Sequence, residues 1–155
     1  MTAKNSTLAH ALNARVLLAP ACLAAGLAIG FASATGNAAT PAEAPIEHKG
    51  LAVEKLGVLE EGTLKATTGL EGYFMQLRAI TIDPGGQIAK HDHKVRPGLV
   101  KVIDGEWVEG RPDGETTDAP GDGEGILEDE NTVHWFFNRG DKPATAIVCD
   151  LTPAS

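Results

Sequence analysis

Residues 84–93 read PGGQIAKHDH, and this stretch carries the strongest signal in the chain. His91 and His93 are separated by one residue, so on a β-strand both imidazoles point to the same face. A third histidine, His134, follows much further along the chain. Neutral imidazole is a common ligand of transition metals. We therefore expect His91, His93 and His134 to converge on one metal ion.

Two simpler interpretations compete with this metal site. A histidine pair on a surface hairpin can be solvated, and a single buried histidine is usually only hydrogen-bonded. The sequence does not choose the ion either, because Fe, Mn, Zn, Ni and Cu all accept imidazole ligands. The expected cofactor is therefore a divalent transition metal of undetermined identity.

The charge of the chain excludes one class of partner. The 155 residues carry a net charge of −8, and the first 34 include two basic and no acidic residues. The remainder holds 11 Lys and Arg against 21 Asp and Glu, a net charge of −10. Such an acidic domain repels phosphate backbones, so we expect no nucleic-acid partner.

The N-terminal residues 1–34 have the pattern of a signal peptide. Lys4 and Arg15 precede an almost wholly apolar run over 16–31, which small residues follow. Cleavage would place the mature protein in the periplasm or outside the cell, with no membrane contact. A retained membrane anchor is the first alternative. A lipoprotein attached through Cys22 is the second.

A linker and one domain follow. Residues 35–50 are rich in Ala and Pro without apolar periodicity, which predicts a flexible segment. His48, at its end, is expected to be solvated. Residues 51–155 are long enough for a single modest core.

Short strands joined by turns predict an all-β domain. Residues 73–82, YFMQLRAITI, alternate as a strand, and a turn is expected at 83–86. Asp104 and Gly105 lie between two strand-like runs, which predicts a hairpin. Further strands are expected at 51–59, 132–137 and 144–151, with one short strand in the polar region 111–125. The expected architecture is a small antiparallel β-barrel or jelly roll.

The spacing of these residues resembles that of the cupin superfamily. The first motif of that family is G-x5-H-x-H-x(3,4)-E-x6-G, and the second is G-x5-P-x-G-x2-H-x3-N. The first is matched by Gly85, His91, His93 and Gly105, and the second by Gly123, His134 and Asn138. The resemblance covers about 70–151 and implies a cupin-like double-stranded β-helix that pairs as a homodimer.

Two positions depart from the family pattern. The Glu ligand of the first motif falls on Gly98, or on Pro97 with the shorter spacing, and the Pro-x-Gly turn has become residues 129–131, DEN. Turn-forming residues remain in the second case. The first departure implies a site of three His without Glu, as in some cupin-type dioxygenases, with Gln87 as a candidate replacement. Three neutral ligands would leave the ion its full charge and favour an anionic ligand.

Four residues are candidates for binding that ligand. Arg78 and Gln76 lie on one face of the strand 73–82, and Arg78 suits a carboxylate. Arg96 follows the histidine pair, and Phe136 shares the face of His134. Each has a plainer role as well: Arg78 can pair with an acidic neighbour, Arg96 can be solvated, and Phe136 can pack in the core.

Two functions follow, and the sequence does not choose between them. The first is an exported metal-dependent enzyme, an oxygenase, isomerase or lyase, that acts on a small anionic organic molecule. The second is a non-catalytic cupin that binds a metal or a small ligand as a sensor or accessory protein. One fold serves both, so the fold alone cannot separate them.

Overall fold

The computed structural model describes residues 43–154. The expected signal peptide lies outside the described residues, as does most of the expected linker, and both stay predictions. Within residues 43–154, no helix has the length and apolar character that a membrane span requires.

The described part of the chain is an antiparallel, mostly-strand fold, as the sequence predicts. The elements in chain order are β1 (Lys49–Leu59), α1 (Glu61–Thr68), β2 (Tyr73–Asp92), β3 (Gly98–Asp104), β4 (Trp107–Arg111), β5 (Gly114–Asp118), β6 (Ile126–Glu128), β7 (Val133–Phe137) and β8 (Ala144–Pro153).

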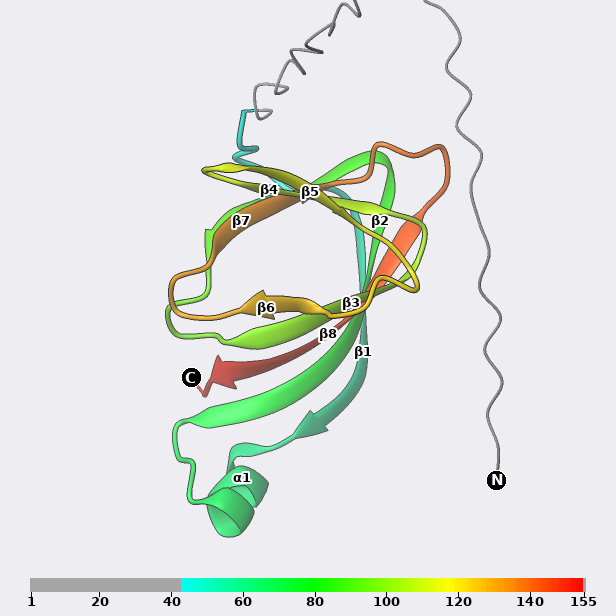
Figure 1. Cartoon of the computed structure of the whole chain (residues 1–155). Coiled ribbons are helices and arrows are strands. Elements are labelled where there is room, and N and C mark those ends of the chain that lie inside the picture. The colour runs from blue at the N-terminus through cyan, green and yellow to red at the C-terminus, as the bar shows by residue number, and fades with distance from the viewer. Residues whose placement is uncertain (1–42, 155) are drawn as a thin grey trace, which may run out of the picture. The chain divides into compact units, whose positions relative to one another are not determined.

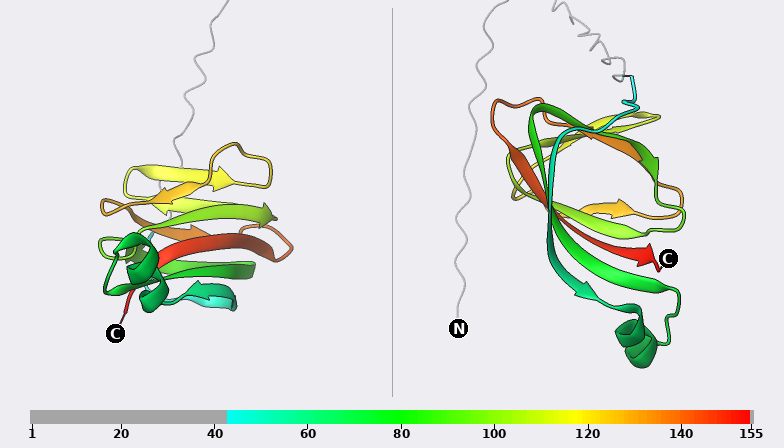
Figure 2. Two further views of the ribbon diagram at one scale, coloured as in Figure 1. Left: turned by 90° about the horizontal axis from the view of Figure 1, so that it is seen from below. Right: turned by 180° about the vertical axis from the view of Figure 1, so that it is seen from behind.

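The strands form two layers that share β2. Their hydrogen-bonded order is β5-β4-β7-β2-β8-β3-β6, and β1 adds to β2 outside this path. In Figure 1, β4, β5 and β7 lie on one side and β3, β6 and β8 on the other. The view from behind in Figure 2 shows the same two layers. The faces that the layers turn toward each other enclose the core.

The turn expected at 83–86 is instead a bend inside the long strand β2. Before the bend β2 pairs with β8, and after it with β7. Gly85 adopts a φ of 69°, and its N–H donates to the carbonyl of Asn138 at 3.0 Å. A Cβ on Gly86 would lie 2.8 Å from the carbonyl oxygen of Asp83. The two glycines therefore let one strand cross from one layer to the other.

The hairpin predicted around Asp104 and Gly105 is wrong. The strand before this turn, β3, pairs with β6 and β8, whereas the next strand, β4, pairs with β5 and β7. Gly105 has a φ of 69°, and a Cβ there would lie 2.7 Å from that of Ala144. The turn therefore connects the layers, and a local turn signal cannot tell this from a hairpin.

The core draws on both layers. Trp107 of β4 is 1 % exposed and packs on Phe136 of β7, with ring centroids 5.0 Å apart. The Nε1–H of Trp107 donates to the carbonyl of Ala144 at 3.1 Å. The buried apolar cluster is completed by Ile80, Ile82, Ile88, Val100, Val102, Ile126, Ala146 and Val148. This core holds rigid the strands that carry the histidines.

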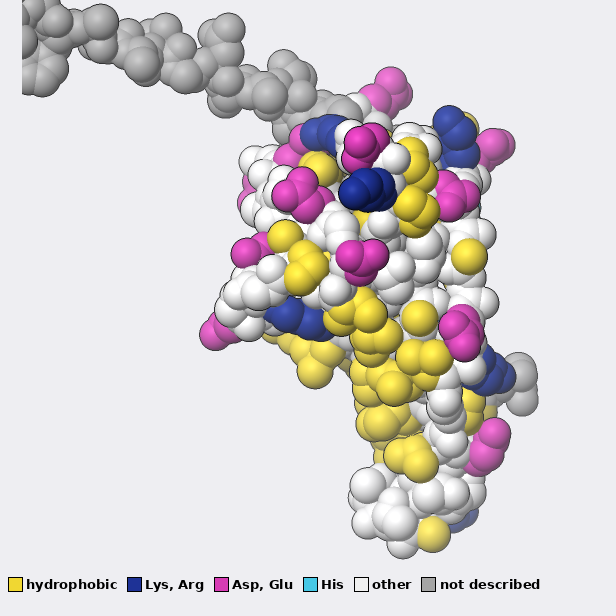
Figure 3. Space-filling model, turned by 90° about the vertical axis from the view of Figure 1, so that its right-hand side faces the viewer, with side chains coloured by type: hydrophobic (Ala, Val, Ile, Leu, Met, Phe, Trp, Pro, Cys, Tyr) yellow, Lys and Arg dark blue, Asp and Glu magenta, His cyan; other side chains and the backbone are white. Residues whose placement is uncertain are grey.

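The layer formed by β2, β8, β3 and β6 has an apolar face on the side away from the core. Leu77, Cys149, Leu99 and Leu127 are register partners across β2, β8, β3 and β6. The three leucines are 38 %, 59 % and 59 % exposed. Figure 3 shows apolar side chains gathered on one face of the molecule. We call these four residues the outward row.

Candidate metal centre

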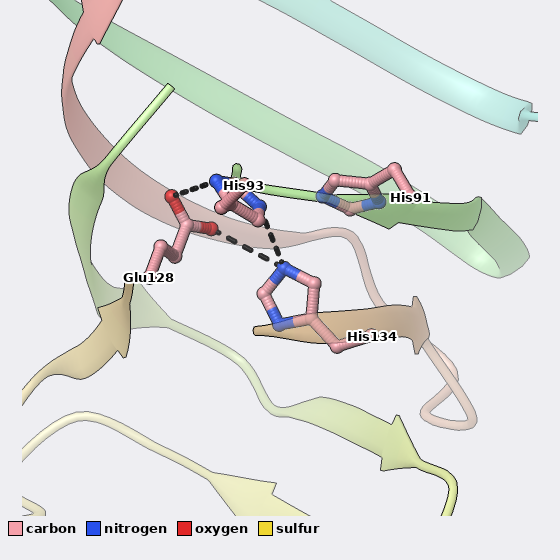
Figure 4. Close-up of side chains that lie close together, drawn as sticks. All are labelled: His91, His93, Glu128 and His134. Atoms are coloured by element: carbon pink, nitrogen blue, oxygen red, sulfur yellow. Dashed lines mark hydrogen bonds and ion pairs between the residues drawn. The ribbon is translucent and has the colours of Figure 1, made fainter. Parts of the chain in front are cut away.

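Three histidines and one glutamate meet between the layers. His91 lies near the end of β2, His93 directly after it, His134 on β7 and Glu128 at the end of β6. Each offers one ligand atom, and these atoms all lie within 4.8 Å of one another (Figure 4). His134 is the register partner of His91. The fold thus brings together the three histidines named from the sequence and adds Glu128, and this cluster could hold a metal ion.

The Nδ1 atoms of the three histidines are already engaged. That of His91 lies 2.8 Å from the carbonyl oxygen of Ala89, and that of His93 lies 2.9 Å from the carbonyl oxygen of Arg96. The Nδ1 of His134 lies 2.6 Å from Oε1 of Glu109. These oxygens only accept, so each Nδ1 donates. In a neutral ring the Nε2 is then bare, which is the form that binds a metal.

Two of these bare nitrogens face each other. Nε2 of His93 and Nε2 of His134 are 3.0 Å apart. With both Nδ1 atoms donating, two neutral rings would place two lone pairs in contact. A proton or a metal ion between them removes this conflict. Both nitrogens can contact one ion at about 2.0–2.1 Å at this separation.

Glu128 supplies a buried carboxylate with one oxygen, Oε2, that accepts no hydrogen bond within the described residues. The residue is 4 % exposed. Oε2 lies 3.4 Å from Nδ1 of His93, and Oε1 lies 3.5 Å from Nε2 of His134. A buried carboxylate oxygen without a donor is costly unless a cation neutralises it. This supports a positive charge at the cluster, either a metal ion or a protonated histidine.

Glu128 corrects the expectation of a site without a carboxylate. Gly98, where the family places its Glu, is the register partner of Glu128. A Cβ on Gly98 would lie only 2.6 Å from Oε2 of Glu128. The glycine on β3 thus leaves the space that a carboxylate from β6 fills. Gln87 does not replace the Glu, since its amide donates to the carbonyl of Glu47 at 2.9 Å.

Motif spacing could not have found Glu128. The family pattern assigns no ligand to its position, and the segment around it reads simply as an acidic, Gly-rich loop. The only sequence signal would have been the pairing of β3 with β6, which sets Gly98 beside Glu128. That pairing is a tertiary feature.

Burial and neighbouring charges shift the pKa values of the three histidines in different directions. Burial lowers the pKa of His91 to about 4, although its hydrogen bond to Ala89 acts the other way. Burial also lowers the pKa of His93. Burial acts in the same direction on His134, but its hydrogen bonds to the Glu109 and Glu128 carboxylates outweigh burial and raise its pKa. His134 is therefore the ring that takes a proton first when no metal competes.

Glu109 orients His134 from the side away from the cluster. It is 5 % exposed, and Nε of Arg111 donates to its Oε1 at 2.8 Å. Burial acts to raise the pKa of Glu109, but the bonds from His134 and Arg111 prevail and lower it. A carboxylate on the distal nitrogen of a metal-binding histidine fixes the tautomer of that ring. The sequence did not single out Glu109, because β4 shows no motif.

A cavity of about 260 Å³ opens beside the cluster. Of the four residues expected to bind substrate, Arg78, Arg96 and Phe136 line it. Gln76 is not among the lining residues, and its amide donates to Asp150 and Thr152 at 2.9 and 3.0 Å. The wall is otherwise mostly apolar and includes Leu51, Val53, Ile80, Ile88, Val100, Trp107 and Val148.

The two arginines of this cavity differ in their partners. Arg78 forms an ion pair with Asp150, as an acidic neighbour allows. The guanidinium of Arg96 forms no hydrogen bond or ion pair with any residue of 43–154, although it is half-buried. An unpaired cation on an apolar wall favours an anionic ligand.

Comparisons with known proteins agree with this geometry. The family model described as Cupin domain matches residues 78–150, and no curated protein matches the chain. The solved Cupin_2 domain of an XRE family transcriptional regulator from Enterobacter cloacae is 18 % identical with a TM-score of 0.51, and the match covers 68 % of this chain and 100 % of that one. The structure of KdgF from Halomonas sp. is 12 % identical with a TM-score of 0.50, over 70 % of this chain and 89 % of that one.

Such low identities show a shared fold and nothing of shared activity. The family match, the antiparallel two-layer fold and the position of the histidines nevertheless agree. Residues 78–150 of the chain are a cupin domain.

Proposed function

We propose that this chain is an exported cupin that binds a divalent transition metal and acts through it on a small organic anion. The ligands are His91, His93, Glu128 and His134. The observation that carries the proposal is the 3.0 Å contact between two bare Nε2 atoms beside a buried carboxylate oxygen without a hydrogen bond. A metal ion at this place would satisfy all of these groups together.

The donor set suits the ions expected from the sequence. Imidazole nitrogens and a carboxylate oxygen are ligands of Fe, Mn, Zn, Ni and Cu. When bound, such an ion would act as a Lewis acid toward an oxygen of the ligand in the cavity. Four protein ligands leave an octahedral ion two open positions, as chemistry at the metal requires.

The protein supplies the selectivity of the site. Glu128 would offset one of the two positive charges of the ion and so weaken, without removing, its attraction for an anion. Arg96 adds a positive charge on the cavity wall. The apolar part of the lining lowers the local dielectric and strengthens this attraction. The cavity volume of about 260 Å³ lies below the 300–1,000 Å³ common for drug-sized ligands, which favours a small acid.

The class of reaction is an oxygenase, isomerase or lyase reaction, and a non-catalytic sensor or accessory protein is the alternative. The test begins with export: the N-terminus of the secreted protein is determined by mass spectrometry. Metal content is then measured on the purified protein. Oxygen uptake and product formation are finally screened with small carboxylic acids. Stoichiometric metal with turnover supports the enzyme, and metal with ligand binding but no turnover supports the alternative.

The matched variant for this test is His91→Asn. The Asn amide can still donate to the carbonyl of Ala89, but it has no atom in the place of Nε2. Wild-type protein that retains no metal after dialysis against Zn²⁺, Mn²⁺ or Fe²⁺ would overturn the proposed function.

We also propose a homodimer. The cupin resemblance favours one, and the outward row offers an uncharged apolar surface on an acidic protein. Light scattering at micromolar concentration tests it, and a monomer mass would contradict it.

A further inference from the structure

A segment assigned to the flexible linker is bonded to the domain beside the cavity. Residues 45–48, which we call the N-terminal strap, lie against β2. The N–H of Lys90 donates to the carbonyl of Pro45 at 2.8 Å, and the amide of Gln87 donates to that of Glu47 at 2.9 Å. The third bond comes from the N–H of Ala89, which donates to Nδ1 of His48 at 3.1 Å. His48 is thus held in place by Ala89 while its side chain stays exposed, as expected from the sequence.

The backbone of Ala89 gives two imidazoles opposite tautomers. Its carbonyl accepts from Nδ1 of His91, which leaves Nε2 of that ring bare. Its N–H donates to Nδ1 of His48, so this nitrogen must be bare and the hydrogen of the neutral ring must lie on Nε2. His91 is thereby prepared to bind a cation. His48 is prepared to donate a hydrogen bond.

His48 lines the same cavity as the cluster and Arg96. Its Nδ1 is engaged, so Nε2–H is the one polar group of the ring left to meet a ligand. His48 is not within the group of atoms that could share a metal ion. A donor that lines the same cavity but lies outside the group of metal ligands can contact a ligand that the cavity holds.

We propose that His48 is a ligand-binding residue whose Nε2–H donates to an oxygen of the anion held at the metal centre. This inference rests on the proposed function and narrows the class of ligand. The ligand is a small organic acid with two oxygen-bearing groups. One group lies at the ion, and the other accepts from His48 in the cavity that Arg96 also lines.

Two substitutions test the roles of the two ring nitrogens of His48 separately. His48→Asn places an amide oxygen near the position of Nδ1, so it keeps the bond from Ala89 and lacks a donor at the position of Nε2. His48→Gln places its amide near Nε2 and gives up the bond from Ala89. His48 is exposed, so neither change opens a hole in the core.

The experiment titrates the full exported protein, loaded with Co²⁺, with two probes. Visible absorption of Co²⁺ reports the binding of malonate, a small dicarboxylate, and of azide, which tests the open position of the ion. We expect His48→Asn to bind Co²⁺ and azide as wild type does. It should bind malonate at least about tenfold more weakly, as for a lost hydrogen bond to a charged group. His48→Gln should recover part of the malonate affinity.

The outcomes distinguish this inference from the proposed function. Equal malonate affinity of His48→Asn and wild type would overturn the role of His48 while leaving the metal centre intact. Wild-type protein that binds no Co²⁺ would overturn the proposed function and the inference with it. Equal weakening of azide and malonate would show that His48 acts only through the geometry of the cluster, which also overturns the inference.

Discussion

Two adjacent rows of residues cross the strands β2, β8, β3 and β6, and the two rows differ in polarity and exposure. Gln76, Asp150, Gly98 and Glu128 are register partners on the face toward the other layer. The outward row is displaced from them by one residue on each strand. We call the first set the inward row. Its members are polar, with one glycine, whereas the outward row consists of three exposed leucines and the half-buried Cys149.

The two rows differ in how far their side chains depend on one another. In the inward row, Gln76 donates to Asp150, Asp150 pairs with Arg78, and Glu128 occupies the space above Gly98. Each buried polar group depends on its neighbours, so a single change affects several contacts. The outward row has no such dependence within the described residues. We therefore expect inward changes to alter ion binding and stability, and outward changes to alter association.

The largest effect should come from removing a ligand of the candidate metal centre. His91→Asn should lower the affinity for Zn²⁺ or Co²⁺ more than about a hundredfold, beyond the 10–100-fold typical of orienting residues. Isothermal titration measures it, and His48→Asn is the matched control because it alters the other imidazole bonded to Ala89. Equal affinity in both variants would remove His91 from the ligand set.

Glu109 tests the residue that orients His134. Glu109→Gln should lower metal affinity by about 10–100-fold, because the negative charge that makes Nε2 of His134 a stronger ligand is lost. The amide can still accept a hydrogen bond, so the fold should be kept. Titration with Zn²⁺ gives the affinity, and circular dichroism gives the melting temperature. A large loss of melting temperature with unchanged affinity would make Glu109 a structural residue only.

Substitution of Gly98 tests whether Glu128 of β6 takes the place of the carboxylate that the family pattern places at position 98. Gly98→Glu alone should lower the free energy of unfolding by about 1–3 kcal/mol, because its Cβ would meet Oε2 of Glu128 at 2.6 Å. The double variant with Glu128→Gly returns the carboxylate to β3 and should recover stability and metal binding. Urea unfolding and metal titration measure both.

Strain from a side chain at Gly98 would come from crowding by neighbouring atoms and not from its backbone conformation. Gly98 is absent from the described glycines with positive φ, so the backbone tolerates a side chain there. A double variant as unstable as Gly98→Glu would show that the crowding comes from Asp150 and Cys149, whose nearest atoms lie 3.1 Å from the same Cβ.

Acid should weaken the metal-free protein through His91. Its pKa of about 4 lies below the ordinary value of 6.5, so the unfolded chain binds the proton first. The stability it contributes is present above pH 6.5 and is lost as the pH falls toward 4. His93 acts in the same direction, whereas the raised pKa of His134 contributes stability at low pH that is lost as the pH rises. Urea unfolding at pH 7 and pH 5 should show a smaller difference for His91→Asn than for wild type.

The smallest effect on stability should come from the outward row. Leu99→Glu should change the free energy of unfolding by no more than about 0.5 kcal/mol, since Leu99 is 59 % exposed. It should nevertheless convert a dimer to a monomer in light scattering, because it places charge in an apolar interface. Val95→Glu, at a 60 % exposed position in the loop between β2 and β3, is the control. A dimer that survives Leu99→Glu would exclude the outward row as its interface.

Sequence determined the parts of this protein that local rules govern. Alternation along 73–82 gave the inward face of β2, and the spacing of His91, His93 and His134 gave the family and brought the three rings to one place. A strand has a period of two, so residue spacing alone fixes which side chains share a face.

Only the tertiary structure decided the remainder. Which strands pair depends on how the whole chain closes, and that pairing set Glu128 beside Gly98 and separated β3 from β4. The role proposed for His48 likewise follows from its hydrogen bond with the backbone amide of Ala89 in β2. Ala89 lies 41 positions further along the chain. Contacts between distant segments depend on the packing of the entire core, which no local pattern encodes.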